Sequence, residues 1–552
     1  MATLPVANWL AHYRREWWRP DVIAGLTAAA VVIPKAMAYA VIAGLPVEVG
    51  LYTALAAMLV YPLLGTSRPL SVTTTSALAM LTSTVVAGAT AETGATPQAV
   101  VATLVLLVGG VLILARVLRL GFLANFISLP VLVGFEAGVG VVIIVGQLKS
   151  VLGVHVQSAK TVGILLELPG LLAQAQGVTM AIALVGMVVL LALPRLYPRL
   201  SAPLVWVALS IAATPLIGLA TYGVKLTGAV PLGLPTLVVP DLSLAAQLWP
   251  AALGIALMSF TESVAAARTF RERDDPPIVA NRELFAIGAA NLASAFAGGL
   301  PAGGGASQTA VANGSGARSQ MAQWVNAGAV LVTLLFFARV ISLLPQAALG
   351  ALIIVASMSM IKPKAFRAIA EVRRRELAWA LITLLGVVLI GTLQGILIAV
   401  AISILTLMYE ANRPPVYAMA YNRAKAVFRR AGEHDADETF PGLLLLRTEG
   451  RLTFVNAANA GEKMRALIAQ TQPRVVVLEC GAIPDIEYTA LTMLTHAEQD
   501  MRARGVELWL AALNPDLLQT VQRTPLGAAL GRERMFFNLD KVLEAWEVRQ
   551  AR

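Results

Sequence analysis

The chain has 552 residues, of which 57% are hydrophobic and 13% charged, whereas an ordinary soluble domain carries roughly 25% charged residues. Most of it is therefore expected to lie in lipid, and the formal net charge of +10 indicates membrane topology instead of nucleic-acid binding, because the basic residues fall at the ends of apolar segments. One cysteine, Cys480, excludes a disulfide framework and a cysteine-based zinc cluster. The histidines lie outside the apolar runs, which argues against a metal or haem in the membrane, and we expect no cofactor: His12, His155, His434 and His496.

The first 20 residues predict a cytoplasmic lead-in, because they hold HYRREWW and lack a short apolar core followed by a cleavage site. Residues 21–411 then predict a transmembrane domain, with apolar runs long enough to cross a hydrocarbon layer of ~30 Å. Two further stretches, Thr73 to Ala87 and Gly305 to Ala317, are too short or too polar to cross it and are expected to be half-spans. The full runs begin near Val22, Leu51, Val100, Phe122, Met180, Ala202, Ala251, Phe285, Trp324, Ala347, Leu377 and Leu393.

Counting both half-spans gives about fourteen segments, most naturally two halves at about residues 21–220 and 246–411. An odd number of segments in each half means that the second half enters from the opposite side, so we expect inverted repeats. Lysine and arginine concentrate on alternate loops and place both termini in the cytoplasm, most naturally at the inner membrane of a bacterium. Four residues break this charge pattern: Lys149, Lys160, Lys225 and Arg339.

The composition changes after Arg413. Residues 412–439 are rich in charge and are interpreted as a linker. Residues 440–552 predict a small cytoplasmic α/β domain, because short strand-like runs such as RVVVLEC alternate with amphipathic stretches. Within it, Asp485 and Glu487 surround a predicted helix start, where the helix dipole favours acidic residues.

The third segment of each half is interrupted by polar sequence, GTSRPLSVTTTSALAM at 65–80 and LPAGGGASQTAVANGSGAR at 300–318. Non-helical backbone survives in hydrocarbon only where protein or a water-filled cavity satisfies its polar groups. A helix that starts at each stretch would offer free N–H donors and about half a positive charge, so we expect a small anion between the two starts. The alternative is that both stretches are ordinary loops. The candidate ligands here are Thr73, Thr74, Thr75, Gly305, Ala306, Ser307 and Gln308.

Three residues inside the apolar runs are ionisable, Lys35, Glu136 and Glu262, and such residues are costly enough in lipid to indicate function. Lys35 precedes Tyr39 by one helical turn, so the pair is a candidate grip for an oxyanion. Alternatively, Lys35 only neutralises a glutamate. Glu136, in VGFEAGVG, is either a helix contact made through close packing at glycine or a second titrating group.

Several long motifs resemble those of the SulP (sulfate permease) anion transporter family. IPKAMAYAVIAGLPVEVGLYTAL is similar to that family's IPQ-x-MAYA-x-x-AGLPP-x-x-GLY signature. SFTESVAAARTF resembles its eighth segment, and NRELFAIGAANLASAFAGG resembles the ELxALGxxN motif that follows. The last domain is similar to the STAS domain that closes such proteins. The resemblance runs from about Pro20 to about Glu547.

The resemblance implies a core domain made of segments 1 to 4 and 8 to 11, and a gate domain made of segments 5 to 7 and 12 to 14. It also implies an anion between the third and tenth segments, elevator-like alternating access, a homodimer, and proton or sodium coupling at Glu262. Thr489 lies near the position where signalling relatives of the STAS domain carry a phosphorylated hydroxyl. The chain departs from the family's pattern at two positions. Lys35 stands where the family usually has Gln, and Gln308 stands where it usually has Arg, so one positive charge has moved across the site. In addition, VTTTSA stands where the family often shows VGPTA.

We therefore expect a secondary active transporter of a small anion, with sulfate as the default substrate and a proton as the coupling ion. Its partners would be the anion, the proton or sodium ion, and the lipid bilayer. The alternatives are a passive anion channel, a sodium-coupled bicarbonate or dicarboxylate transporter, and a membrane sensor with a STAS output. An enzyme is not expected, because the sequence carries no HExxH, GxSxG or P-loop motif.

Overall fold

The computed structural model consists of two compact units, Met1–Ser403 and Ile404–Arg552. Residues 1–7 and 12 of the predicted lead-in lie outside the described residues, as do two residues of the predicted linker. The structure describes residues 8–550 except 12, 126–127, 157, 159, 198–199, 229–230, 232 and 435–436.

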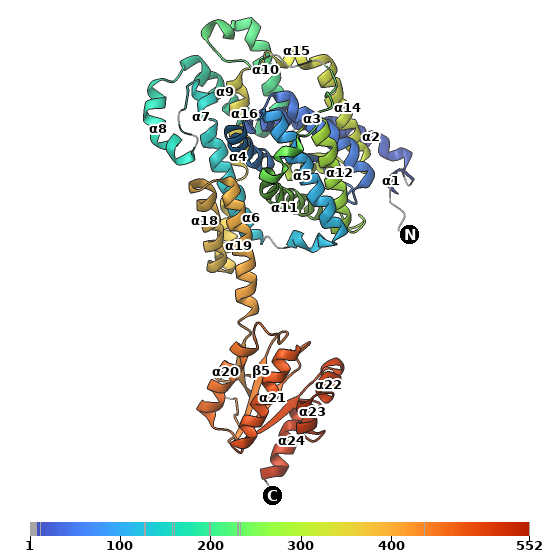
Figure 1. The fold of residues 1–552 in the computed structure, drawn as a ribbon, viewed down its shortest axis with the longest axis vertical. Helices are drawn as coiled ribbons and strands as arrows, with labels where there is room; N and C mark the ends of the chain where they lie inside the picture. The colour runs from blue at the N-terminus through green and yellow to red at the C-terminus, as the bar shows by residue number, and fades with distance from the viewer. Residues whose placement is uncertain are drawn as a thin grey trace. The chain divides into compact units, whose positions relative to one another are not determined.

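The first unit is a helical bundle, and a helix lies at each of the predicted full spans (Figure 1). Among the described helices, nine are long and apolar enough to cross a membrane by length and composition. The helices at the predicted spans are α2 (Trp18–Ile42), α3 (Val47–Leu64), α5 (Pro97–Val117), α6 (Leu129–Gly146), α9 (Gly177–Leu196), α10 (Ala202–Ile217), α11 (Ala245–Thr269), α12 (Ala280–Phe296), α14 (Met321–Val332) with α15 (Ala338–Ile341), α16 (Gln346–Met358), α18 (Arg374–Leu389) and α19 (Thr392–Ala411).

The two interrupted segments form α4 (Ser76–Thr93) and α13 (Ala306–Gly314). The first of these differs from the prediction, because α4 has 18 residues and continues well past Ala87, whereas α13 has nine. The polar residues from Thr90 to Thr93 lower the hydropathy of α4 without breaking it, and its C-terminal end is capped by Gly94 with φ of 68°. The helix therefore has an interior start but nearly the length of a full span.

Three further differences from the prediction concern one helix bound and two additional helices. The span expected from Phe122 starts at Leu129, because Leu120–Asn125 forms a short 3-10 helix and Pro130 occupies the first turn of α6. The helix α8 (Thr161–Ala173) was not predicted as a separate element. The basic cluster after α16 forms the amphipathic helix α17 (Pro363–Val372), which contains no buried residue.

The helices of the first unit pack as two groups. One contains α2 to α5 and α11 to α14, in which α5 packs on α11 and α12, and α14 packs on α2 and α3. The other contains α6 to α10 and α16 to α19, in which α6 packs on α18 and α9 packs on α16. We call them the core group and the gate group. They correspond to the core and gate domains that the family resemblance implies.

Glycine permits the closest helix contacts in both groups. A Cβ atom on Gly50 of α3 would lie 1.9 Å from the backbone oxygen of Ala36 in α2. In the gate group, a Cβ atom on Gly134 of α6 would lie 2.1 Å from the backbone oxygen of Ala380 in α18. Such contacts between backbones are typical of helix packing in membranes, where small residues replace a hydrophobic driving force.

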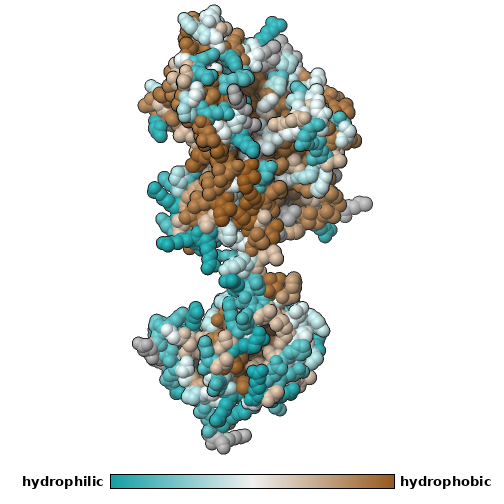
Figure 2. All heavy atoms as spheres, turned by 60° about the vertical axis from the view of Figure 1, so that its left-hand side comes forward, coloured by the Kyte–Doolittle hydropathy of each residue, from teal (hydrophilic) through white to brown (hydrophobic). Residues whose placement is uncertain are grey.

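Large apolar side chains cover much of the outer surface of the first unit (Figure 2). Leu166 and Leu216, for example, are 79% and 84% exposed. A soluble protein rarely exposes a continuous apolar surface of this extent, so this surface faces lipid.

The second unit contains a six-stranded sheet in the order β4-β3-β5-β6-β7-β8, in which β5 to β8 are parallel and β3 and β4 are antiparallel. Helices α20 (Ala457–Thr471) and α21 (Tyr488–Ala503) share one hydrophobic cluster with the sheet, and α24 (Leu539–Gln550) shares another. The stretch 412–439, interpreted as a linker, holds β3 and β4. Its charged residues sit on an edge hairpin, which sequence charge alone does not distinguish from a linker. The strands are β3 (Val416–Asn422), β4 (Val427–Arg430), β5 (Leu443–Thr448), β6 (Val475–Glu479), β7 (Glu507–Ala511) and β8 (Met535–Phe536).

Candidate functional site

The two interrupted stretches meet inside the core group. Strand β1 (Val72–Thr73) pairs antiparallel with β2 (Gly303–Gly304), and each strand leads within three residues into a helix. The N-cap of α4 is Thr75, and the N-cap of α13 is Gly305. Both strands are fully buried. The structure thus brings two helix N-termini, some 230 residues apart in sequence, to one place.

The extended backbone at 300–305 obtains its hydrogen bonds from side chains of neighbouring helices. Asn291 of α12 bonds both polar groups of Ala302, with its Oδ1 accepting from the backbone N–H and its Nδ2 donating to the oxygen, each at 2.9 Å. Ser259 Oγ also donates to that oxygen at 2.6 Å, and Ser263 Oγ accepts from the N–H of Gly304 at 2.6 Å. These partners satisfy the condition under which non-helical backbone exists at membrane depth.

One side-chain amide, that of Gln320, forms three hydrogen bonds with the extended backbone of the first half. Gln320 Nε2 donates to the backbone oxygens of Ser67, Arg68 and Leu70 at 2.7, 3.1 and 3.0 Å. The N–H of Ser71 donates to Thr309 Oγ1 at 3.1 Å, and the oxygen of Ser71 accepts from the N–H of Gly305 at 3.1 Å. The stretch of the first half is therefore held by residues of the second half, whereas the side chains that hold 300–305 come mainly from α11 and α12 of its own half.

Glycine at β2 is required by the close approach of neighbouring atoms. A Cβ atom on Gly303 would lie 2.9 Å from Leu78 Cδ1, and one on Gly304 would lie 2.7 Å from Leu70 Cδ1 and 2.9 Å from Ser263 Cα. Any larger residue would therefore clash with leucine side chains of the first half and, at Gly304, with the backbone of α11.

The two helix starts differ in the donors that they leave available. Thr75 Oγ1 caps α4 by accepting from the backbone N–H of Leu78 at 3.3 Å. The start of α13 has no such cap among the described residues, since its N-cap is glycine. The first N–H groups of a helix have no partner inside the helix, so α13 offers the larger set of free donors to an anion.

Lys35 and Tyr39 of α2 reach the two helix starts separately. Lys35 Nζ donates a hydrogen bond to Ser307 Oγ in the first turn of α13, at 3.0 Å. Tyr39 is buried beside Ser76, in the first turn of α4, and beside Glu262. The residues on one face of α2 thus contact both half-helices.

Two of the predicted ligands contact each other across the pseudo-symmetric halves. Thr73 Oγ1 donates to Gln308 Oε1 at 2.7 Å, and both side chains are buried. The hydroxyl of Thr74 is buried too, and it has no hydrogen-bond partner among the described residues. Ala306 contributes its backbone only, as the first residue of α13.

Glu262 lies next to the start of α4. It accepts a hydrogen bond from Thr75 Oγ1 at 3.0 Å. Within the described part of the chain no ion pair joins Glu262 to Lys35, so the arrangement gives no support to the alternative in which the lysine only neutralises this glutamate.

Glu136 lies in the gate group and forms an ion pair with Lys362, at 2.7 Å between Oε2 and Nζ. Gly134, two residues before Glu136, allows α6 to approach α18 at Ala380. Met360, two residues before Lys362, contacts the core group. Its Sδ lies 3.3 Å from Ser76 Oγ, in the first turn of α4. A charged pair of the gate group therefore lies close to one helix start.

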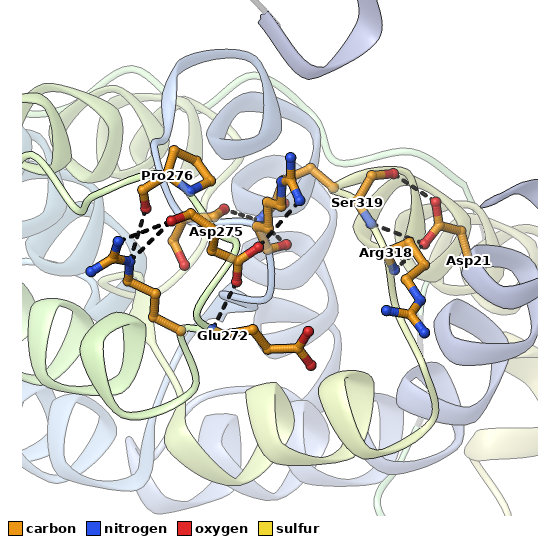
Figure 3. Close-up of polar contacts among 10 residues, drawn as sticks. Asp21, Glu272, Asp275, Pro276, Arg318 and Ser319 are labelled. Carbon is orange, nitrogen blue, oxygen red and sulfur yellow. Dashed lines mark hydrogen bonds and ion pairs between the residues drawn. The ribbon is translucent and has the colours of Figure 1, made fainter. Parts of the chain in front are cut away.

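Two buried acids were missed by the sequence analysis, which found only three ionisable residues in apolar runs. Asp21 at the start of α2 accepts from the N–H groups of Arg318 and Ser319 at 2.6 and 3.1 Å, and from Ser319 Oγ at 2.6 Å (Figure 3). Glu283 of α12 accepts from Tyr61 Oη at 2.8 Å and from the N–H of Thr66 at 2.7 Å. Both acids sit at run ends, where a solvated loop is the usual interpretation.

An ion pair joins the loop between α11 and α12 to the first half of the chain. Asp275 forms an ion pair with Arg68 at 3.3 Å, and Arg271 donates to the backbone oxygens of Asp275 and Pro276 at 2.9 and 3.1 Å (Figure 3). Glu272 donates its N–H to Asp275 Oδ2 at 3.0 Å. Arg68 directly precedes the extended stretch that leads to β1, so this network anchors one end of the site.

In the second unit the predicted regulatory region is exposed. Asp485 pairs with Arg451 at 2.6 Å, Glu487 is the N-cap residue of α21, and Thr489 is exposed in the first turn of that helix. Burial raises the pKa of the Cys480 thiol, which keeps it protonated. No group of three His, Cys, Asp or Glu residues in the described structure could hold a metal ion.

The chain is similar to known proteins over most of its length. Profiles of the sulfate permease family and of the STAS domain match residues 18–383 and 436–541. The chain is 34% identical to a probable sulfate transporter of Mycobacterium tuberculosis over 99% of this chain and 100% of that protein. It is 25% identical to chloroplastic sulfate transporter 4.1 of Arabidopsis thaliana, over 98% of this chain and 82% of that one.

Two solved structures are similar in fold. Murine solute carrier 26 family member A9, an anion transporter in the inward-facing state, matches with a TM-score of 0.89 at 20% identity, over 99% of this chain and 94% of that chain. The transmembrane domain of a cyanobacterial bicarbonate transporter matches with a TM-score of 0.61 at 22% identity, over 70% and 98%.

Proposed function

The chain belongs to the sulfate permease family, and on that basis we propose that it is a secondary active transporter of a small anion, with sulfate as the first candidate. As a member of that family it is an integral membrane anion transporter with a STAS domain, and not an enzyme. Its site at the half-helix starts, its coupling ion and the motion that carries the anion are the parts that we propose.

The observation that carries the proposal is the pairing of β1 with β2, which brings the starts of α4 and α13 together. Their partial positive charges add where the helices face one another, and the uncapped start of α13 supplies free N–H donors. The hydroxyls of Thr74 and Ser307 add further donors, whereas the hydroxyl proton of Thr73 is held by Gln308. We propose that the anion binds here, with Lys35 as its counter-charge.

The positions of Lys35 and Gln308 support the idea that the site's positive charge has moved from α13 to α2. Gln308 is neutral and its Oε1 is occupied by Thr73, so at α13 the amide holds the two halves together. Lys35 reaches the same helix turn from α2, through Ser307. A lysine is a compact point charge without the planar fork of arginine, so we expect selection by charge and size more than by bidentate geometry.

We propose that Glu262 carries the coupling proton. Thr75 connects it to the start of α4, since one hydroxyl caps the helix and donates to the carboxylate. A negative carboxylate there repels the anion, whereas a protonated one does not. Proton binding and anion binding therefore favour each other, and by linkage the effect is reciprocal.

The proposed motion is an elevator-like displacement of the core group against the gate group. The side-chain hydrogen bonds between the groups include weak or solitary ones, such as Ser76 to Met360 Sδ at 3.3 Å, Thr84 to Thr392 at 2.8 Å and Ser201 to the oxygen of Ala30 at 3.1 Å. Separate small contacts break at modest cost, because each is worth only about 1 kcal/mol net. The cores of both groups remain intact during such a displacement.

The Glu136 and Lys362 pair is a candidate second titrating element, on the gate side of the anion path. Its lysine side chain is half exposed, at 51%. If the anion passes this side chain, Lys362 can exchange Glu136 for the anion, and the Glu136 carboxylate, which is 20% exposed, is then left to take up a proton or water. We place the protein, as a homodimer with cytoplasmic termini, in the inner membrane of a bacterium, and the loop charges support this orientation.

Uptake into proteoliposomes tests the proposal. Radiolabelled sulfate, bicarbonate and a dicarboxylate are offered in turn, each with and without an imposed proton gradient. Accumulation of sulfate above its external concentration, lost when the gradient is collapsed, is the expected result. Uptake that ignores the gradient would indicate a channel, and dependence on sodium would indicate a sodium-coupled transporter.

A further inference from the structure

The second unit contains a cavity of about 510 Å³ between α20, α21 and the sheet. This volume falls in the range of roughly 300–1,000 Å³ that small-molecule sites occupy. The cavity belongs to neither the anion site nor the regulatory region at Thr489. Its walls belong to the hydrophobic cluster that α20 and α21 share with the sheet.

The walls of the cavity are aliphatic. The helices supply methionine and aliphatic side chains, and strands β5 to β7 supply leucine and valine. Methionine side chains are flexible and polarisable, so they fit a ligand of variable shape. Phenylalanine, tyrosine and tryptophan are not among the described residues that line the cavity, so its walls offer no large aromatic face to a nucleobase. The principal wall residues are Met464, Ile468, Met493, Leu494, Met501 and Leu508.

The charged residues that line the cavity give it one net positive charge. They are Arg465 from α20, and Asp500 and Arg504 from the end of α21, together with His496. Counting the histidine as neutral, two arginines and one aspartate leave a charge of +1. Neither arginine forms an ion pair within the described part of the chain, whereas the nearby Arg502 pairs with Glu498.

We propose that this cavity binds a single-chain alkyl carboxylate, with the tail between α20 and α21 and the head at Arg465 and Arg504. The aliphatic walls select an unbranched tail, because burial of apolar surface drives its binding. The guanidinium groups select an anionic head, and their planar donors suit a carboxylate. The single net charge favours a monoanion over a dianionic phosphate. This inference does not depend on the identity of the transported anion.

Helix α20 also connects the cavity to the chain that leaves the last membrane helix. Asn456, the N-cap residue of α20, donates to the oxygen of Ala411 at 3.1 Å, and Lys463 Nζ donates to the oxygen of Pro414 at 2.9 Å. Ala411 is the last residue of α19. A ligand that separates α20 from α21 therefore acts on the helix that is bonded to the end of α19.

Photolabelling of the full chain in lipid nanodiscs tests the proposal. The probe is a medium-chain alkyl carboxylate with a diazirine near the end of its tail, and labelled peptides are identified by mass spectrometry. We expect label on the peptides that contain Met493 and Met501. The corresponding alcohol probe, which has the same tail and no charge, should label them about tenfold less, the loss that corresponds to about 1.4 kcal/mol.

Variants locate the head and tail. The double variant Arg465→Gln and Arg504→Gln should lower carboxylate labelling about tenfold, while the matched control Arg502→Gln, on the same helix, should leave it unchanged. Ala460→Phe should fill the cavity and remove the label. Equal labelling by the acid and alcohol probes in the unmodified chain, or label confined to the membrane helices, would overturn the proposal, even if Ala460→Phe does not fold.

Discussion

Replacing Lys35 by glutamine removes the positive charge that reaches the start of α13 and keeps a side chain that can still hydrogen-bond Ser307. Because Lys35 Nζ lies 3.0 Å from Ser307 Oγ, an anion bound at that helix turn lies about 4 Å from the charge. Unit charges at that distance attract by ~4 kcal/mol at an effective dielectric constant of about 20. Lys35 is only half-buried, so solvent screening reduces this value, and a charged hydrogen bond is worth about 1.5–3 kcal/mol. The variant should bind the anion roughly 10- to 150-fold more weakly.

Isothermal titration calorimetry on the purified protein in nanodiscs measures this difference. Lys35→Arg keeps the charge and should retain most of the affinity. Lys364→Gln is the matched control, because it removes an exposed lysine of the amphipathic helix α17. The loss should be larger for sulfate than for a monovalent anion, since the attraction scales with charge. Unchanged affinity in a folded Lys35→Gln protein would refute the role of Lys35 as counter-charge.

Three further predictions address coupling, packing and pH. Glu262→Gln should abolish accumulation driven by a proton gradient while anion binding persists, and a normal proton response in vesicles would contradict the coupling role. Gly304→Ala should cost about 1–3 kcal/mol through overpacking and reduce uptake, whereas Gly314→Ala, whose Cβ would meet nothing within 4 Å, should change neither melting temperature nor uptake. Hydrogen bonds from Arg429 lower the pKa of Asp437 from 3.8 to about 2, so the carboxylate stabilises the fold above about pH 4 and loses this effect as the pH falls toward 2. Asp437→Asn should therefore speed hydrogen exchange in the β3 to β4 hairpin at about pH 7, with a difference that shrinks through this window; a difference independent of pH would count against the ion pair.

Hydropathy located the membrane segments because lipid imposes a length and composition that single residues report. The two interrupted segments were recognisable for the same reason, since PAGGG and SRP cannot continue a lipid-facing helix. Placing Thr73 near Gln308 required one further step, the inverted-repeat argument, which relates equivalent positions in the two halves. None of these inferences needs a contact between particular side chains.

What hydropathy could not supply is the set of side chains that satisfy the broken backbone. Gln320 bonds carbonyl groups some 250 residues earlier in the chain, and Asn291 bonds a segment that lies beyond the end of its own helix. Asn291 lies inside α12 and Gln320 is the N-cap residue of α14, and neither position names a partner in the sequence. Asp21 and Glu283 were missed because an acid at the end of an apolar run has the pattern of a solvated residue.

The bounds of the shorter elements depend on packing, so they were harder to predict from the sequence. The charged residues of 412–439 resemble a linker, and only pairing with β5 turns part of that stretch into strand β3, which lies next to the edge strand β4. Helix α4 continues past its apolar part because its polar residues emerge at the surface, where Glu92 contacts Gln247 of α11. The cavity between α20 and α21 has no sequence signature, because it results from the spacing of two helices.

The most direct test of the anion site is a pair of cryo-electron microscopy maps, recorded with and without a saturating concentration of the anion that proteoliposomes accumulate. We predict added density between the first turns of α4 and α13, within hydrogen-bond distance of Ser307 and close to Lys35. Density for the bound anion at any other place, or none between these turns at saturation, would contradict this prediction.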